Sequence, residues 1–208
     1  DGRWEESPNG RPVVAAGSPL PGMEVRIAAA EGNVGPIEIR GSSLAGGYVG
    51  ADLSLTPDGW LSTNDVGIIV NGDLHVVGRV DDLLIVAGRN LYAHDVEIVV
   101  AAMTGIRSSN AVAIDTATGR YVVIAETVLG TDRLRLAAAI REALVAALGT
   151  GPGSVIFVRG GTLPKTPSGK IQRHRVRALY EGDELATEDV FPFAATTAGE
   201  DRSRVART

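Results

Sequence analysis

The chain has 208 residues, enough for one ordinary domain or two small ones that each bury a core. Hydrophobic residues make up 44% and charged residues 22%, a balance typical of a globular protein rather than a disordered or fibrous one. The net charge of −5 argues against a general nucleic-acid binder, and the absence of cysteine excludes disulfides, thiolate metal sites and cysteine nucleophiles.

No stretch approaches the roughly 18 consecutive apolar residues that a membrane span needs, so we expect none. The first twelve residues are polar and acidic, unlike a signal peptide, which makes the cytoplasm the default compartment. His75, His94 and His174 lack metal-ligand spacing, so we expect no metal site built from them.

The first eighty residues predict mostly β-structure. After a loose polar lead-in (1–12), apolar and polar residues alternate at 24–27 and 37–40, which is the period of half-buried strands. Asn71-Gly72 then separates two β-branched runs. This pair favours a type I′ hairpin turn, because both central residues of that turn need positive φ.

The pattern changes after Arg79 to a mixture of strands and helices. Strand-like runs occupy 81–88, 110–116, 120–128 and 154–160. Apolar residues at helical spacing predict helices from His94 onward, over 131–149 and over 171–180, with Thr131 as cap and Gly149 as end of the second. We therefore expect a β-rich piece at 1–79, a compact α+β piece at 80–180 and a mobile tail at 181–208.

Residues 163–170 (LPKTPSGK) predict an exposed loop. It is stiff at its two prolines and permissive at Gly169, and it presents Lys170 at its tip. A lysine so placed suits delivery of a point charge to a phosphate, although most lysines in such loops are simply solvated. A P-loop is excluded, because position 164 is not glycine and no Ser or Thr follows Lys170.

Two other segments carry polar residues suited to a nucleotide. Asp65 ends a short apolar run; it is either a turn former or an acceptor for ribose hydroxyls. Arg79 has the planar fork that binds phosphate or ribose, while the neighbouring Asp81 is equally compatible with a surface position. Gly88 permits a tight turn with close backbone approach.

In order and spacing these segments resemble the adenylate-forming (acyl-activating) superfamily of acyl-CoA synthetases, fatty acyl-AMP ligases, luciferases and nonribosomal adenylation domains. Residues 35–48 resemble its GE-L-I-G…A-GY segment, and 60–67 its TGDLG segment with Asn64 in place of Gly. Residues 78–97 resemble its GR-D…GRN-Y…DIE region, and 164–170 its PKT-SGK loop. The likeness runs from about residue 17 to 180.

The resemblance implies a role for each matched position. Asp65 would bind the ribose hydroxyls, and Arg79 the ribose or a phosphate. Asp81 would be the hinge of a mobile lid, and Gly88 would lie near the tunnel for a pantetheine arm. Lys170 would be the catalytic residue that stabilises the adenylation transition state.

The resemblance also implies an α+β architecture: 1–79 as the β-rich end of a large adenylation domain, followed by a small α+β C-terminal lid at 80–180. The rest of the large domain, with the Mg²⁺ ligands, the adenine stack and the phosphate loop, would be a missing N-terminal portion. The whole enzyme would use ATP to convert a carboxylic acid, of the fatty acid class, to acyl-AMP. It would then pass the acyl group to the phosphopantetheine thiol of an acyl carrier protein.

The segment GRNLYAHDVE is closest to fatty acyl-AMP ligases, with Ala93-His94 in place of the usual Pro-Gln. Asp81 is instead common in acyl-CoA synthetases, so CoA is the alternative acceptor. A third possibility is a non-catalytic module that binds a carrier protein or a partner ligase. The basic tract 165–177 could dock an acidic carrier protein or could be a solvated helix face, and Lys165 within it is expected to be a simple loop charge.

Overall fold

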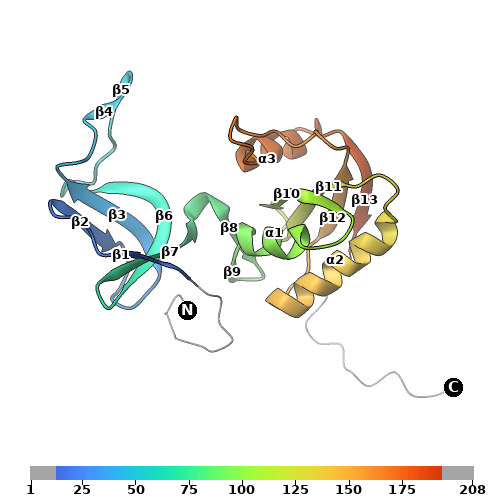
Figure 1. The fold of residues 1–208 in the computed structure, drawn as a ribbon, viewed down its shortest axis with the longest axis horizontal. Helices are drawn as coiled ribbons and strands as arrows, with labels where there is room; N and C mark the ends of the chain where they lie inside the picture. Colours follow the sequence, from blue (N-terminus) through green and yellow to red (C-terminus); the bar gives the residue numbers. More distant parts are fainter. Residues whose placement is uncertain (1–12, 194–208) are drawn as a thin grey trace, which may run out of the picture. The chain divides into compact units, whose positions relative to one another are not determined.

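The computed structural model describes residues 13–193 (Figure 1). The chain divides into two compact units, 1–83 and 84–208, so the division falls shortly after the expected boundary at 79/80. The lead-in expected at 1–12 and the end of the expected tail, 194–208, lie outside the described residues. Within 13–193, no helix is long and apolar enough to cross a membrane.

The first unit is built on an antiparallel five-stranded sheet with the order β1-β7-β6-β3-β2. The strands predicted at 24–27 and 37–40 are confirmed as β2 and β3. A separate two-stranded hairpin, β4 with β5, extends from the loop between β3 and β6 (Figure 1). The bounds are β1 Ala15–Gly17, β2 Met23–Ile27, β3 Gly35–Gly41, β4 Gly47–Tyr48, β5 Ala51–Asp52, β6 Leu61–Val70 and β7 Asp73–Arg79.

The turn between β6 and β7 confirms the hairpin prediction. Asn71 has φ 52° and Gly72 has φ 88°, so both central residues are left-handed, as a type I′ turn requires. This turn sets the register of the adjoining ends of the two strands, from Val70 opposite Asp73 to Gly67 opposite Val76. The register then shifts by one residue between Gly67 and Val66, and this shift places Asp65 opposite Arg79.

A stack of side chains anchors the start of β6. Trp60 is 7% exposed, and the guanidinium carbons of Arg26 and Arg40 lie 4.4 and 4.6 Å from its ring centroid. Arg26 also donates to Asp58 at 2.6 Å. That hydrogen bond is the main reason why the pKa of Asp58 falls to about 2. The cluster holds the strand that carries Asp65.

The second unit is a three-layer α+β structure around a four-stranded sheet with the order β10-β11-β12-β13 (Figure 1). Helix α2 connects the parallel strands β11 and β12, and the other pairings are antiparallel. The short 3₁₀ turn η1 (Val80–Asp82) precedes this unit. The bounds are β8 Leu83–Val86, β9 Arg89–Tyr92, α1 Ala93–Ala101, β10 Ile106–Asp115, β11 Tyr121–Thr127, α2 Arg133–Leu148, β12 Ser154–Val158, α3 Arg173–Glu181 and β13 Thr187–Pro192.

The alternation of side chains along β11 separates the two cores. Every residue of β11 is buried, which identifies it as a strand covered on both faces. Val123 and Ala125 belong to the core formed with α1 and α2, whereas Val122 and Ile124 belong to the core that includes Val176 of α3. Position 126 therefore points to the α3 side, and this governs the environment of the lysine loop.

The cap predicted for α2 was wrong. The cap of α2 is Asp132 rather than Thr131: its carboxylate accepts from the backbone N–H of Arg135 at 3.2 Å. The Thr131 hydroxyl instead donates to the carbonyl of Val128 at 2.8 Å. The end of the helix at Gly149, with φ 72°, agrees with the prediction.

The interpretation of 181–208 as a mobile tail is wrong for Thr187–Pro192, which form the edge strand β13. This strand pairs with β12, and the ring of Phe191 packs edge-on against Phe157 with centroids 5.8 Å apart. Most of its side chains are exposed, so the strand lacks a continuous apolar face. A prediction from the alternation of apolar and polar residues therefore misses such a strand.

Candidate functional site

The structure brings Asp65 and Arg79 together. They are directly opposite each other on β6 and β7, with Arg79 Nε 3.4 Å from Asp65 Oδ1. The side chains are 41% and 56% exposed, respectively. An ion pair this exposed contributes little to stability, so both groups remain free to exchange their mutual contact for a ligand.

Asn64 connects this pair to the expected hinge. It has φ 65°, the left-handed conformation that glycine adopts most easily and that asparagine tolerates better than most residues. The departure from the TGD pattern is therefore compatible with the backbone. The Asn64 side-chain amide donates to the carboxylate of Asp81, which is exposed in η1.

The lysine loop forms a hydrogen-bonded turn. Lys165 and Ile171 make an antiparallel bridge, and Thr166 N donates to the carbonyl of Lys170 at 2.8 Å. Gly169 has φ 83° and donates to the carbonyl of Thr166 at 2.8 Å. The turn presents Lys170 to solvent, and within residues 13–193 no side chain or carbonyl hydrogen-bonds or pairs with its ammonium group.

A carboxylate that sequence reasoning did not single out anchors the C-terminal side of this loop. Glu97 of α1 accepts from the guanidinium of Arg173 through both oxygens, at 2.7 and 2.9 Å, and from Ala113 N at 3.0 Å. The two charged side chains are only 17% and 18% exposed. Because Arg173 begins α3, three residues after Lys170, this contact fixes where the loop ends.

Lys165 is an exposed loop charge, and its ammonium also donates to the side-chain carbonyl of Asn110 on β10. Asn110 is 6% exposed. The two lysines of the loop therefore differ: one is used within the protein, and the other is available to a ligand.

Gly88 lies in the tight turn between β8 and β9. Ala87 has φ 49° and Gly88 has φ 75°, which is again the type I′ arrangement. Alanine carries a steric penalty in this conformation, on the order of 1 kcal/mol. The turn is therefore strained at its first position, next to the residue expected near the pantetheine tunnel.

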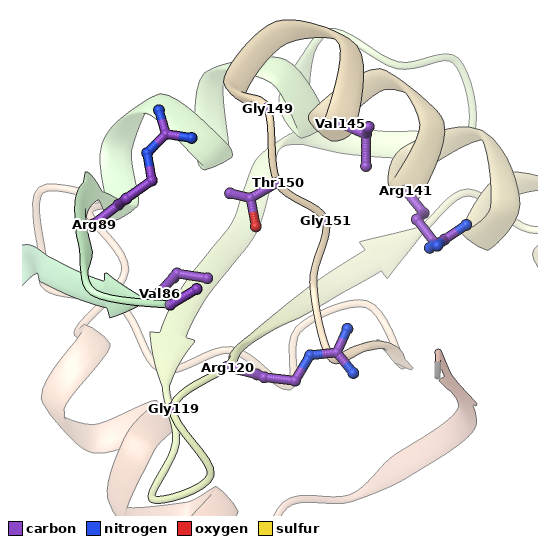
Figure 2. Close-up of a pocket in the computed structure, with 10 residues that line it drawn as sticks. Val86, Arg89, Gly119, Arg120, Arg141, Val145, Gly149, Thr150 and Gly151 are labelled. Atoms are coloured by element: carbon purple, nitrogen blue, oxygen red, sulfur yellow. The ribbon is translucent and has the colours of Figure 1, made fainter. Parts of the chain in front are cut away.

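A cavity of about 470 Å³ lies beside this turn. Its walls include Ala87 and Arg89, which flank Gly88, but not Gly88 itself. Figure 2 shows Arg89, Arg120 and Arg141 reaching the cavity from three different elements. It is therefore a positively charged hollow within the second unit.

Two of these arginines already have structural contacts. Arg120 donates to the carbonyls of Pro152 and Phe193 at 2.9 and 2.7 Å, and Arg141 lies over the Phe193 ring at 5.4 Å. Arg89 is exposed. It is thus the arginine of the three that is most available to an incoming anion.

No metal centre emerges from residues 13–193, where no three His, Asp or Glu side chains are grouped as ligands. The three histidines lie on β7, α1 and α3.

Comparison with known proteins yields a consistent set of relatives, although no family model matches the chain. It is 34% identical over 182 residues to the putative ligase Rv1013 of Mycobacterium tuberculosis, across 79% of this chain and 34% of that protein. It is 32% identical over 185 residues to the probable long-chain-fatty-acid–AMP ligase FadD30 of the same organism, across 77% and 32%. The chain thus spans about a third of the length of these relatives.

The comparison of folds gives the same kind of relative as the comparison of sequences. A solved structure from work on fatty acyl-adenylate ligases of E. coli and L. pneumophila matches with a TM-score of 0.73 and 30% identity, over 82% of this chain and 33% of that one. In sequence and fold, the chain matches the C-terminal portion of adenylate-forming ligases. The expected resemblance and the expected α+β fold class are therefore confirmed.

Proposed function

We propose that this chain is the lid-bearing part of an ATP-dependent ligase that activates a fatty acid as acyl-AMP and passes the acyl group to a thiol. The observation that carries this proposal is the ammonium of Lys170, which has no partner among residues 13–193. It lies on a turn whose following helix is fixed by Glu97 and Arg173. An adenylation site needs a positive charge held ready in this way.

In the first half-reaction, a carboxylate oxygen of the acid attacks the α-phosphorus of ATP, and pyrophosphate leaves. Asp65 accepts hydrogen bonds from the ribose hydroxyls, and Arg79 holds the ribose or a phosphate. Their opposition across β6 and β7 supports this assignment, because one ligand can reach both. Lys170 neutralises the charge that develops between the carboxylate and the α-phosphate.

In the second half-reaction, the acyl group moves from AMP to a thiol. A rotation of the lid about Asp81 would withdraw Lys170 and bring the Ala87-Gly88 turn to the thiol path. The exposed Arg89 and the charged cavity beside that turn suit an acceptor that carries phosphate on its pantetheine arm.

We favour a carrier protein over CoA as the acceptor. The sequence GRNLYAHDVE and the similarity to a fatty-acid–AMP ligase support this choice. To test it, the complete enzyme (this chain together with the larger portion expected before it) is given a fatty acid, ATP and either CoA or a phosphopantetheinylated carrier protein. We expect thioester on the carrier protein only. Rapid acyl-CoA formation, with CoA competing against the carrier, would show that the acceptor is CoA while leaving adenylation intact.

A further inference from the structure

Glu126 is a charged residue inside the sheet of the second unit. It lies in β11 with 1% of its surface exposed, and its side chain points to the α3 side. A carboxylate removed from water in this way is costly unless hydrogen bonds and positive charge compensate it. Its partners therefore indicate what the charge is for.

Those partners lie at the start of the lysine loop. One oxygen of Glu126 accepts from the backbone N–H groups of Gly161 and Leu163, at 2.9 and 3.1 Å. The other accepts from the Asn110 amide at 2.6 Å and lies 3.7 Å from Nε of Arg107. Two of the contacts thus hold the backbone that follows β12.

Asn110 extends the network to Lys165. An ionised carboxylate accepts hydrogen bonds only, so Glu126 obliges Asn110 to turn its NH₂ inward. The amide oxygen of Asn110 then faces the loop and accepts from the Lys165 ammonium. Glu126 thereby acts on positions 161, 163 and 165, the last of them through Asn110.

We propose that Glu126 is a positioning residue for Lys170. Lys165 bridges to Ile171, and its neighbour Thr166 bonds to the carbonyl of Lys170, so the place of Lys165 sets the place of Lys170. The inference rests on the role proposed for Lys170 and adds the buried group that determines where its ammonium stands. A displacement of about 1 Å at a reacting centre can cost as much as 10²-fold in rate.

The test uses Glu126→Gln in the complete enzyme, which keeps the side-chain shape and one acceptor oxygen but removes the charge. We expect the kcat of carboxylate-dependent pyrophosphate exchange to fall about tenfold. The KM values for ATP and for the fatty acid should stay within about twofold of wild type. Thioester formation from supplied acyl-AMP should also stay within about twofold, because that step does not use Lys170. A purely structural defect would lower both half-reactions together.

A rescue and a matched control make the test specific. In the double variant Glu126→Gln/Asn110→Asp, the carboxylate moves to position 110, where it can accept from Lys165 and from the new amide at position 126. We expect exchange to return to within about threefold of wild type. The control is Asp115→Asn, a more exposed acid on β10 whose partner Arg177 lies on α3 beyond the loop; it should change neither half-reaction by more than about twofold.

A second arm is independent of any activity. In the 208-residue chain, Glu126→Gln should lower amide hydrogen-exchange protection about tenfold within 161–170, while β11 and β12 keep theirs. If the variant fails to fold, Lys165→Met serves in both arms. If the complete enzyme does not adenylate, the proposed function fails. The hydrogen-exchange measurement on the 208-residue chain still decides whether Glu126 holds the loop. The inference would be overturned if Glu126→Gln behaved like Asp115→Asn in both the half-reaction rates and the hydrogen exchange. It would also be overturned if the double variant failed to restore pyrophosphate exchange.

Discussion

Lys165 and Lys170 lie on one turn, and their ammonium groups differ in their contacts. Lys165 at its N-terminal side is bound to buried Asn110 and, through it, to Glu126. Lys170 follows the tip on the C-terminal side, and its ammonium has no hydrogen bond or ion pair within the part of the chain that the structure describes. The same side chain in the same loop is thus a structural tie in one position and an available charge in the other.

The difference shows how a lysine can be assigned a role from its contacts. A lysine whose charge is satisfied internally cannot also meet a phosphate without breaking that contact. A lysine at a fixed turn without a partner is prepared for a ligand, because little reorganisation is required when the ligand arrives. Applying one substitution to each lysine tests the distinction directly.

The largest effect is expected for Lys170→Met. Carboxylate-dependent pyrophosphate exchange by the complete enzyme should fall by about 10²-fold or more, as when one transition-state charge donor is lost. The measurement is the steady-state rate of exchange with labelled pyrophosphate. A fall below about threefold would remove Lys170 from the adenylation step.

A smaller effect is expected for Lys165→Met, which removes the same charge five residues earlier. The Asn110 oxygen loses its donor, so the loop loosens, and exchange should fall about tenfold with unchanged KM values. Stability should drop by about 1 kcal/mol, measured by urea denaturation of the 208-residue chain. If Lys165→Met were as damaging to exchange as Lys170→Met, the division of roles between the two lysines would be wrong.

Loss of the contact between Glu97 and Arg173, which anchors the C-terminal side of the loop, should mainly lower stability. Arg173→Met leaves the mostly buried Glu97 without its bidentate partner, at a cost on the order of 2 kcal/mol. Arg173→Lys should recover part of this, because a lysine supplies the charge but not the planar fork. Urea titrations followed by helix circular dichroism would measure both variants. Equal stability of wild type and Arg173→Met would show that the anchor is not needed.

The smallest effect is expected at the tip itself. The hydroxyl groups of Thr166 and Ser168 form an exposed hydrogen bond of 2.9 Å. Ser168→Ala should change the exchange rate by less than about threefold, since an exposed neutral bond contributes about 1 kcal/mol or less. A tenfold loss would place the control of Lys170 in the tip rather than in the buried network.

Local sequence signals predicted much of the fold. Asn71-Gly72 identified its turn because few residue pairs accept two positive φ values. Helical spacing identified the segment that ends at Gly149. The edge strand β13 escaped because it buries few side chains, and the cap at Asp132 escaped because two adjacent residues were both good candidates.

The candidate site was predictable only in its chemically distinctive parts. Lys170, Asp65 and Arg79 stand in patterns that mark them. The sequence could not show that Lys170 has no partner among residues 13–193, or that Asp65 and Arg79 face each other. From the sequence, Glu126 is predicted only as part of a strand. An acid inside the all-apolar run YVVIA-E is a signal of a paired buried charge, but its partners in the loop lie 35 and 37 residues away.

The central claim is that this chain serves an enzyme that forms an acyl-adenylate. The most direct test is to incubate the complete enzyme with ATP and a fatty acid, without any thiol acceptor, and to quantify all nucleotide products by mass spectrometry. We expect acyl-AMP and pyrophosphate in a 1:1 ratio, up to about one equivalent per enzyme when the intermediate stays bound. Formation of ADP and phosphate, or no cleavage of ATP in the presence of the acid, would contradict the claim.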